Sequence, residues 1–322
     1  MKPEQKGGKR LVFVSKAVIL QFASVVIMRR NIFEGLGIAL VTPFTTDGAV
    51  DYVALRRLIT YHTQNGADFL CILATTGESP TLTSEEKRRI RQMAVETVGG
   101  RIPILMGLGG NNTAAIVEEL RTSDLTGVDG ILSVCPYYNK PSQEGLYRHF
   151  HAIAAATTLP IVLYNVPGRT GVNLDAATTL RLARDCANIV AIKEASGNLD
   201  QVCTIIKGAP EGFGVISGDD ALTYPMVACG AVGVISVLGN ALPKEISQML
   251  RLEKSGDYEA ARTIHHQLGD LFGLLFVDGN PAGIKAMLNA MGMAEDVLRL
   301  PLVPARPATR QRIAELLKDF KH

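Results

Sequence analysis

A lysine and a tyrosine each stand at the end of an apolar run, where their side chains are suited to carbonyl chemistry. Lys193 closes the run Ile189–Ile192, and Tyr164 closes the preceding run. Apolar surroundings disfavour the ammonium form of a lysine, and the neutral amine is a nucleophile. Its attack on a ketone gives a Schiff base, an electron sink for making an enamine without a cofactor. If the two runs are adjacent strands about 4.8 Å apart, the Tyr164 phenol can reach the amine and transfer protons.

Two other groups are suited to binding a carboxylate. Thr75 and Thr76 supply two hydroxyls and, with Gly77, backbone amides at a turn. Arg169 follows a Pro-Gly turn, where its guanidinium can project and match a carboxylate with two hydrogen bonds. The pattern therefore favours a substrate that carries both a ketone and a carboxylate.

Each of these side chains, taken alone, has a plainer explanation. Lys193 also fits a lysine that begins a solvated loop, and Tyr164 a tyrosine packed at the rim of a barrel. Thr75 and Thr76 fit an ordinary polar turn before a helix, and Arg169 fits a surface arginine. Only their combination argues for a catalytic site.

Two further motifs have more than one interpretation. The pair Tyr137 and Tyr138 lies in a proline-containing loop, where an oligomer contact, plain packing and catalysis are all open. The glycine-rich stretch 107–112 resembles a dinucleotide fingerprint but fails the G-x-G-x-x-G spacing, and it follows the third strand rather than the first. We therefore do not expect a nucleotide cofactor.

The composition narrows the class of partners. The chain has 322 residues, 47% of them hydrophobic, and its 33 basic and 31 acidic residues leave a net charge of +2, which disfavours a nucleic-acid partner. The five cysteines form no C-x-x-C pair, so we interpret them as reduced thiols of a cytoplasmic protein. The six histidines form no H-E-x-x-H motif, so no metal is expected.

Residues 1–28 stand apart from the patterned part of the chain. Residues 11–27 are apolar and follow a basic start, like the hydrophobic region of a signal peptide, but they are fewer than the ~20 that a membrane span needs. Lys16 interrupts this run, and a second methionine, Met28, stands just before the patterned part. We interpret residues 1–28 as an extension, disordered or the product of a misassigned start; a short helix and an export signal are the alternatives.

From Gly37 onward, short apolar runs alternate with amphipathic stretches, as in parallel strands joined by crossover helices. The expected strands are 37–42, 69–74, 103–107, 130–134, 161–164, 189–193, 213–217 and 233–236. The expected helices between them are 52–64, 84–98, 113–125, 143–156, 175–187 and 199–207, and Thr83 with Glu86 is spaced for a capping box. After Pro243 the pattern is helical, including 258–275, 281–291 and 308–320.

This pattern predicts an α/β fold, a (β/α)8 TIM barrel with a C-terminal helical extension. We place the catalytic barrel at residues 29–242 and the helical region at 243–322. In such barrels the active site lies at the carboxyl ends of the strands. Every candidate residue above follows or ends a predicted strand, so we expect them to meet at one face.

Five motifs occur together and in a fixed order. They are Thr75–Ser79, Pro136–Asn139, Tyr164–Thr170, Ile192–Glu194 and Ser217–Asp220. On these motifs the chain closely resembles the dihydrodipicolinate synthase family, also called 4-hydroxy-tetrahydrodipicolinate synthases, within the pyruvate-dependent class I aldolases. The resemblance covers residues 33–318.

The resemblance implies the role of each catalytic residue. Lys193 would form a Schiff base with pyruvate, so no cofactor is implied beyond this covalent imine. Tyr164, Thr76 and Tyr138 would make the proton relay, with Tyr138 reaching in from a neighbouring subunit. A homo-oligomer is implied, usually a tetramer built as a dimer of dimers.

The resemblance also implies the substrate contacts. Thr75 and Thr76 would help hold the pyruvate carboxylate, and Arg169 that of L-aspartate 4-semialdehyde. Gly218 and Ile235 match positions that line the site through backbone carbonyls. Condensation of the two substrates would be the first committed step of diaminopimelate and L-lysine biosynthesis.

Two alternatives remain at this point. Sister aldolases, such as N-acetylneuraminate lyase and 2-keto-3-deoxy sugar acid aldolases, share the lysine and tyrosine; Thr76 and Arg169 favour the synthase. A catalytically silent barrel that only binds a partner would be expected to lack Lys193 or Tyr164, and both are present.

In members that L-lysine inhibits, the resemblance places the effector at a dimer interface. The matching positions here are Ser79, Pro80, Ser84, Lys87, Asn111, Ala115 and Tyr137. Ala115 stands where sensitive enzymes carry a glutamate for the ammonium of lysine, and Ser84 and Lys87 replace histidines. A lost charged partner costs about 1.5–3 kcal/mol, and Lys87 adds repulsion, so we expect weak or absent inhibition by lysine.

Overall fold

The computed structural model describes residues 31–320, so the predictions for residues 1–28 lie outside the part described here. Eight parallel strands form a closed barrel in sequence order, each paired with the next and β8 paired with β1. The strands are β1 (Gly35–Ala39), β2 (Phe69–Ile72), β3 (Ile104–Gly107), β4 (Gly130–Val134), β5 (Ile161–Asn165), β6 (Ile189–Glu194), β7 (Gly214–Ser217) and β8 (Gly233–Ser236). The predicted barrel is confirmed.

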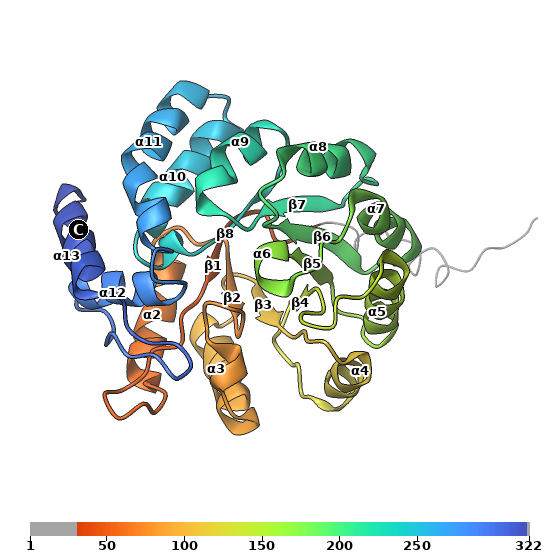
Figure 1. Ribbon diagram of the computed structural model, residues 1–322, viewed down its shortest axis with the longest axis horizontal. Coiled ribbons are helices and arrows are strands. Elements are labelled where there is room, and N and C mark those ends of the chain that lie inside the picture. Colours follow the sequence, from red (N-terminus) through yellow and green to blue (C-terminus); the bar gives the residue numbers. More distant parts are fainter. Residues whose placement is uncertain (1–30, 321–322) are drawn as a thin grey trace, which may run out of the picture.

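Helices surround the strands, and those after the barrel lie along one side of it (Figure 1). The crossover helices are α2 (Tyr52–Gln64), α3 (Ser84–Val98), α4 (Thr113–Thr122), α5 (Gln143–Ala155), α6 (Pro167–Thr170), α7 (Ala176–Asp185), α8 (Leu199–Gly208) and α9 (Thr223–Ala228). The C-terminal helices are α10 (Pro243–Lys254), α11 (Tyr258–Leu274), α12 (Ala282–Ala290) and α13 (Pro307–Leu316), with short 3-10 turns at Ser79–Thr81, Asp220–Leu222, Leu238–Asn240 and Leu317–Asp319. The segment after α12 lies against α2, since Arg57 donates a hydrogen bond to the Met293 carbonyl.

Several predicted boundaries were wrong. The first strand is Gly35–Ala39 rather than 37–42. Strand β2 ends at Ile72 rather than at residue 74, because Leu73 has a left-handed φ of 55°, which is incompatible with an extended strand. The short helices α6 and α9 follow β5 and β7 and were not predicted, since runs of 4 and 6 residues are too short for a helical period to show. The capping box of α3 is confirmed, with the Thr83 hydroxyl accepting from the Glu86 amide and the Glu86 carboxylate accepting from the Thr83 amide.

Two aromatic rings fill part of the barrel interior, and glycines in the strands leave room for them. Phe33 and Phe69 are fully buried, with ring centroids 5.4 Å apart in an edge-to-face arrangement. A Cβ on Gly37 would lie 2.3 Å from the Phe69 ring, and one on Gly130 would lie 2.6 Å from the Phe33 ring. Any side chain at either glycine would therefore displace a ring from the core.

The pairing of β5 with β6 contains an irregularity that matters for the site. Ile161 pairs with Ile189, but Val162 pairs with Ala191, so Val190 is one extra residue in β6. After this bulge Tyr164 pairs with Lys193. Partners in a parallel pair project to the same face, so the bulge sets these two side chains next to each other.

Among residues 31–320, no helix is both long enough and apolar enough to cross a membrane.

Candidate active site

Lys193 and Tyr164 lie side by side at the carboxyl ends of β6 and β5. Both are buried, with 5% and 6% of their surface exposed, and the Lys193 ammonium lies 4.4 Å from the centroid of the Tyr164 ring. The predicted pair of Lys193 and Tyr164 is thus brought together inside the barrel. A nearby thiol is kept protonated, because burial raises the pKa of Cys71 to about 11, an effect that the charge of Lys193 partly opposes.

Gly218, directly after β7, packs against the lysine side chain. A Cβ there would lie 3.0 Å from Lys193 Cε, 3.1 Å from Lys193 Cγ and 2.8 Å from Ala195 Cβ. Contacts this short would force Lys193 or Ala195 to move, so a glycine at position 218 allows the Lys193 side chain to keep its present position. Ile235, the other predicted lining residue, lies buried within β8 and pairs with Gly37.

The residues that follow Tyr164 and Lys193 lock the ends of their strands. Glu194 is 1% exposed, and its carboxylate accepts from Asn165 Nδ2 at 3.1 and 3.2 Å, from Gln201 Nε2 at 3.0 Å and from the Ser196 amide at 2.7 Å. Asn165 Oδ1 accepts from the backbone amide of Leu174 at 2.9 Å. A buried carboxylate with this many donors is well satisfied, so the network stiffens the frame that carries the reactive pair.

The two threonines lie in a turn after β2 that is bounded by unusual backbone. Leu73 and Glu78 have φ values of 55° and 53°, in the left-handed region. Thr76 is buried, and its hydroxyl oxygen Oγ1 lies 3.0 Å from Asn280 Nδ2, which donates to it. Thr75 is partly exposed. Left-handed residues other than glycine persist only where their surroundings hold them.

A buried ion pair holds the left-handed Glu78. Its carboxylate contacts the Lys285 ammonium of α12, and both side chains are fully buried. Lys285 also donates to the Val297 carbonyl at 2.8 Å, and the Arg299 amide donates to Glu78 at 3.1 Å. Burial lowers the pKa of Lys285 to about 8, while the Glu78 carboxylate favours the charged form. Removing one partner would leave a buried charge unpaired, which is strongly destabilising.

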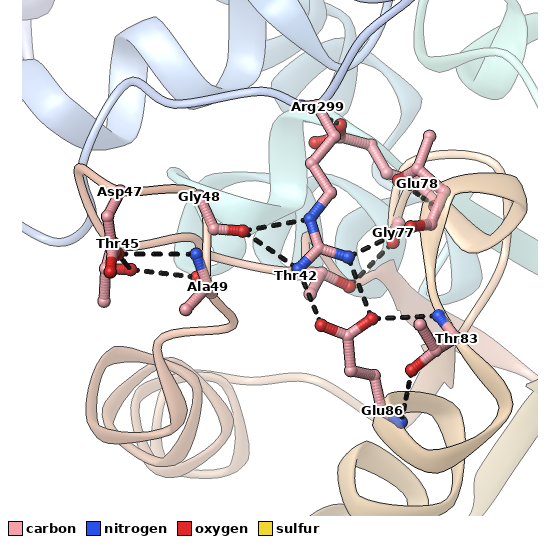
Figure 2. A network of polar contacts seen from close by, with 11 residues as sticks. Thr42, Thr45, Asp47, Gly48, Ala49, Gly77, Glu78, Thr83, Glu86 and Arg299 are labelled. Atoms are coloured by element: carbon pink, nitrogen blue, oxygen red, sulfur yellow. Dashed lines mark hydrogen bonds and ion pairs between the residues drawn. The ribbon is translucent and has the colours of Figure 1, made fainter.

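Arg299 fastens the C-terminal segment to the other side of the same turn (Figure 2). Its guanidinium donates to the Gly48 carbonyl at 2.9 and 3.0 Å and to the Thr81 carbonyl at 3.0 Å. It also makes two hydrogen bonds, of 2.6 and 2.8 Å, with the carboxylate of Glu86. One side chain thus connects the loop before α2, the turn after β2 and the first turn of α3.

A cavity of about 480 Å³ opens at this face of the barrel. It is lined by Thr75 and Glu78 of the turn, by Tyr164 and Arg169 from the β5 end, and by Asn280. Thr76, Lys193, Gly218 and Ile235 do not line it; Thr76, Lys193 and Ile235 are buried, and Gly218 is partly exposed. The cavity therefore reaches the tyrosine directly, and the lysine lies against the tyrosine ring.

The predicted relay tyrosine Tyr138 lies exposed in the loop after β4. It is 89% exposed, has a φ of 76°, and its amide donates to the Thr170 carbonyl at 3.3 Å. The loop is tied to the start of α4, because Asn111 Nδ2 donates to the Tyr137 carbonyl and Asn139 Nδ2 donates to the Asn111 carbonyl, both at 3.1 Å. The structure does not bring Tyr138 to Lys193 within one chain.

The residues predicted for an effector site are only partly brought together. Ser79, Pro80, Lys87 and Tyr137 line the same cavity, as do the charged residues Arg91 and Glu119. Ser84, Asn111 and Ala115 are exposed and do not line it.

Reasoning from the sequence missed the residues that support the turn: Asn280, Lys285 and Arg299. Lys285 was detectable, since it is the one charged residue of the mainly apolar helix α12. Asn280 and Arg299 lie in loops, and nothing in their spacing indicates which part of the barrel they contact. Within residues 31–320, no group of three or more His, Cys, Asp and Glu residues is arranged to hold a metal ion, and all five cysteines are free thiols.

Comparison with known proteins gives one consistent result. Residues 32–320 match the model of the dihydrodipicolinate synthetase family. A protein of Phocaeicola vulgatus named 4-hydroxy-tetrahydrodipicolinate synthase is 61% identical over 288 residues, which are 89% of this chain and 97% of that protein. A protein of the same name from Parabacteroides distasonis is 60% identical over 287 residues, 89% of this chain and 97% of its own length.

Solved structures agree. The crystal structure of dihydrodipicolinate synthase from Aquifex aeolicus matches with a TM-score of 0.86 and 45% identity, over 89% of this chain and 98% of that one. A monomeric dihydrodipicolinate synthase variant matches with a TM-score of 0.87 and 42% identity, over 89% and 97%. The Cyanidioschyzon merolae enzyme with lysine bound matches with a TM-score of 0.87 and 41% identity, over 90% and 98%.

The contact between Glu86 and Arg299 predicts how stability depends on pH. The hydrogen bonds from Arg299, aided by the capping interaction with Thr83, lower the pKa of Glu86 to about 2. The unfolded chain, with an ordinary glutamate pKa of about 4.3, therefore takes up the proton first as the pH falls. The stabilisation is complete above about pH 4.5 and is lost as the pH falls towards 2.

We therefore expect Glu86→Gln to lower the free energy of unfolding by about 1.5–3 kcal/mol at pH 7. The difference from wild type should shrink as the pH falls below about 4.5, measured by denaturant unfolding at a series of pH values. The neighbouring Glu85→Gln is the matched control, because among residues 31–320 Glu85 forms its one salt bridge with the exposed Arg88, and the change should alter stability by less than about 1 kcal/mol. A Glu86→Gln difference that stays constant from pH 7 to 3 would contradict this account.

Proposed function

The chain belongs to the dihydrodipicolinate synthetase family, and we propose that it condenses pyruvate with L-aspartate 4-semialdehyde to 4-hydroxy-tetrahydrodipicolinate. This is the lyase reaction that commits carbon to diaminopimelate and L-lysine. The observation that carries the proposal is the burial of Lys193 beside Tyr164 at the carboxyl end of a closed barrel. No feature of the site favours a sister aldolase over the synthase.

Lys193 is the proposed nucleophile. Its neutral amine attacks the C2 carbonyl of pyruvate, water leaves, and an imine forms. Loss of a C3 proton gives the enamine, whose C3 then bonds to the aldehyde carbon of the second substrate. The amino group of that substrate displaces Lys193 at C2 and closes the ring, which returns the free lysine. The imine itself accepts the electrons, so we propose that the reaction needs no cofactor and no metal.

Tyr164, Thr76 and the partner's Tyr138 are the proposed proton relay. Tyr164 is adjacent to the lysine and lines the cavity, which supports a role in transferring protons between the imine and the substrate. Thr76 is buried and hydrogen-bonded, which suits a fixed hydroxyl in a relay. Tyr138 completes it only if another subunit supplies it, because it is 89% exposed on its own chain.

The carboxylates of the two substrates need separate partners. We propose that Thr75 and Thr76 hold the carboxylate of pyruvate through their turn. Arg169, exposed and lining the cavity, is the proposed partner of the second substrate. Backbone carbonyls at Gly218 and Ile235 are the proposed remaining contacts.

We further propose a homo-oligomer whose smallest active unit is a dimer, assembled further into a dimer of dimers. A tyrosine that is exposed and has a positive φ, such as Tyr138, costs free energy unless other contacts offset it. We propose that contact with a second copy of the chain offsets this cost. The five unpaired cysteines support a cytoplasmic location.

The direct test is turnover of pyruvate with L-aspartate 4-semialdehyde, coupled to reduction of the product. We expect activity in wild type, and a loss of more than about 10³-fold in Lys193→Ala, because the nucleophile is gone. Lys207→Ala, at an exposed lysine at the end of α8, should retain wild-type activity. Wild-type turnover of N-acetylneuraminate or a 2-keto-3-deoxy sugar acid, with none of the semialdehyde, would move the protein to a sister aldolase.

Complementation tests the shared site. Lys193→Ala and Tyr138→Phe should each be nearly inactive, but subunits mixed by joint refolding should regain about a quarter of wild-type activity, since half the dimers are hybrids with one intact site. Lys193→Ala mixed with Tyr164→Phe is the control and should regain nothing, because both residues belong to one barrel. Equal recovery in the two mixtures would refute a tyrosine supplied in trans.

The charged residues that line the cavity predict weak feedback inhibition by L-lysine. Lys87 and Arg91 line the cavity with two carboxylates, Glu119 and the Glu78 that is already paired with Lys285, and Ala115 supplies no charge for the effector's ammonium. We expect half-inhibition only above millimolar lysine, and at least about tenfold tighter inhibition in Ala115→Glu. Half-inhibition of wild type at sub-millimolar lysine would show that this reasoning is wrong.

A further inference from the structure

The hydroxyl of Thr76 has one hydrogen-bond partner within residues 31–320. Asn280 Nδ2 donates to Thr76 Oγ1 at 3.0 Å, and the two residues are 3% and 7% exposed. The two come from distant parts of the chain, the turn after β2 and the loop before α12. Asn280 lines the cavity together with Thr75 and Tyr164, so this contact lies at the edge of the substrate space.

The direction of this hydrogen bond decides what the hydroxyl can do next. A threonine hydroxyl has one proton to donate and two lone pairs that accept. Because Asn280 donates, it occupies a lone pair and leaves the Thr76 proton free for another acceptor. An acceptor at position 280 would instead take that proton and remove the hydroxyl from a proton relay.

The loop that carries Asn280 is held firmly to the barrel. Lys285, in the following helix, makes the buried contact with Glu78, two residues beyond Thr76. Arg299 binds the same turn and α3. Asn280 and Thr76 are thus fixed from both sides, and their relative position does not depend on a mobile loop end.

We propose that Asn280 is a positioning residue of the reaction, which orients the Thr76 hydroxyl so that its proton points into the relay. The proposal rests on the function proposed above, in which Thr76 takes part in proton transfer. Asn280 is proposed to act through Thr76, whose hydroxyl it contacts. The proposal predicts a larger effect on kcat than on binding of pyruvate, because Thr75 and the turn proposed to hold the pyruvate carboxylate are left unchanged.

Asn280→Asp tests the direction of the bond with little change in shape. An ionised carboxylate only accepts, so at neutral pH it should capture the Thr76 proton. We expect kcat to fall about tenfold or more, with KM for pyruvate within about twofold of wild type. As the pH is lowered and the carboxyl becomes protonated it can donate again, so the ratio of variant to wild-type kcat should rise. A purely structural role predicts a ratio that does not change with pH.

Two further variants keep the test decisive. Asn289→Asp makes the same change in α12 at an amide that donates to the Ala294 carbonyl, and it should leave the pH profile of kcat as in wild type. If Asn280→Asp does not fold, Asn280→Ala should still lower kcat about tenfold, without recovery at low pH. Combined with Thr76→Val, either change at position 280 should cost little more than Thr76→Val alone.

The outcomes separate the two proposals. An inactive wild type would overturn the proposed function. An active wild type, with kcat unchanged in Asn280→Asp and Asn280→Ala, or with effects that add fully to those of Thr76→Val, would overturn the positioning role alone.

Discussion

Strand β6 contains one residue more than β5 between the first two pairs of their ladder, and the geometry of the site depends on that bulge. Without it, Tyr164 would pair with Ile192 and Lys193 with Asn165, because every later partner would shift by one residue. A one-residue shift in a strand turns its side chains to the opposite face. The bulge therefore places the amine beside the phenol. The glutamate that follows the lysine is then satisfied by Asn165 and Gln201, and Gly218 leaves the lysine room.

The second half of the site is assembled by a different means. The threonine turn after β2 is not held by strand pairing, since Leu73 leaves the extended conformation at once. It is held instead by side chains, namely Thr42, whose hydroxyl donates to the Gly77 carbonyl, and Arg299 (Figure 2). Asn280 and Lys285, also from the C-terminal region, contact Thr76 and Glu78. The helices after the barrel thus have a role beyond covering its side. They help to position the hydroxyls, whereas the pairing of barrel strands positions the amine.

The sequence was sufficient for the barrel and for the chemistry on its strands. Continuous apolar runs indicate strands that are buried on both faces. Lys193 and Tyr164 can be identified as candidate catalytic residues because each ends such a run. What the sequence could not provide is the register between strands, because a bulge such as that at Val190 changes no local pattern. Nor could it provide the contacts of Asn280 and Arg299, which join segments about 200 residues apart. The exposure of Tyr138 on its own chain agrees with the proposal that it acts in a neighbouring subunit, a role that only the family resemblance indicated.

The central claim is that pyruvate forms an imine with Lys193 and with no other amine. Reduction with borohydride in the presence of pyruvate makes that imine permanent, and peptide mapping by mass spectrometry then locates it. The account predicts a pyruvate adduct on the peptide that contains Lys193, formed without added cofactor, and none in Lys193→Ala. An adduct on another lysine of the active wild-type protein, or turnover without any trapped adduct, would contradict it.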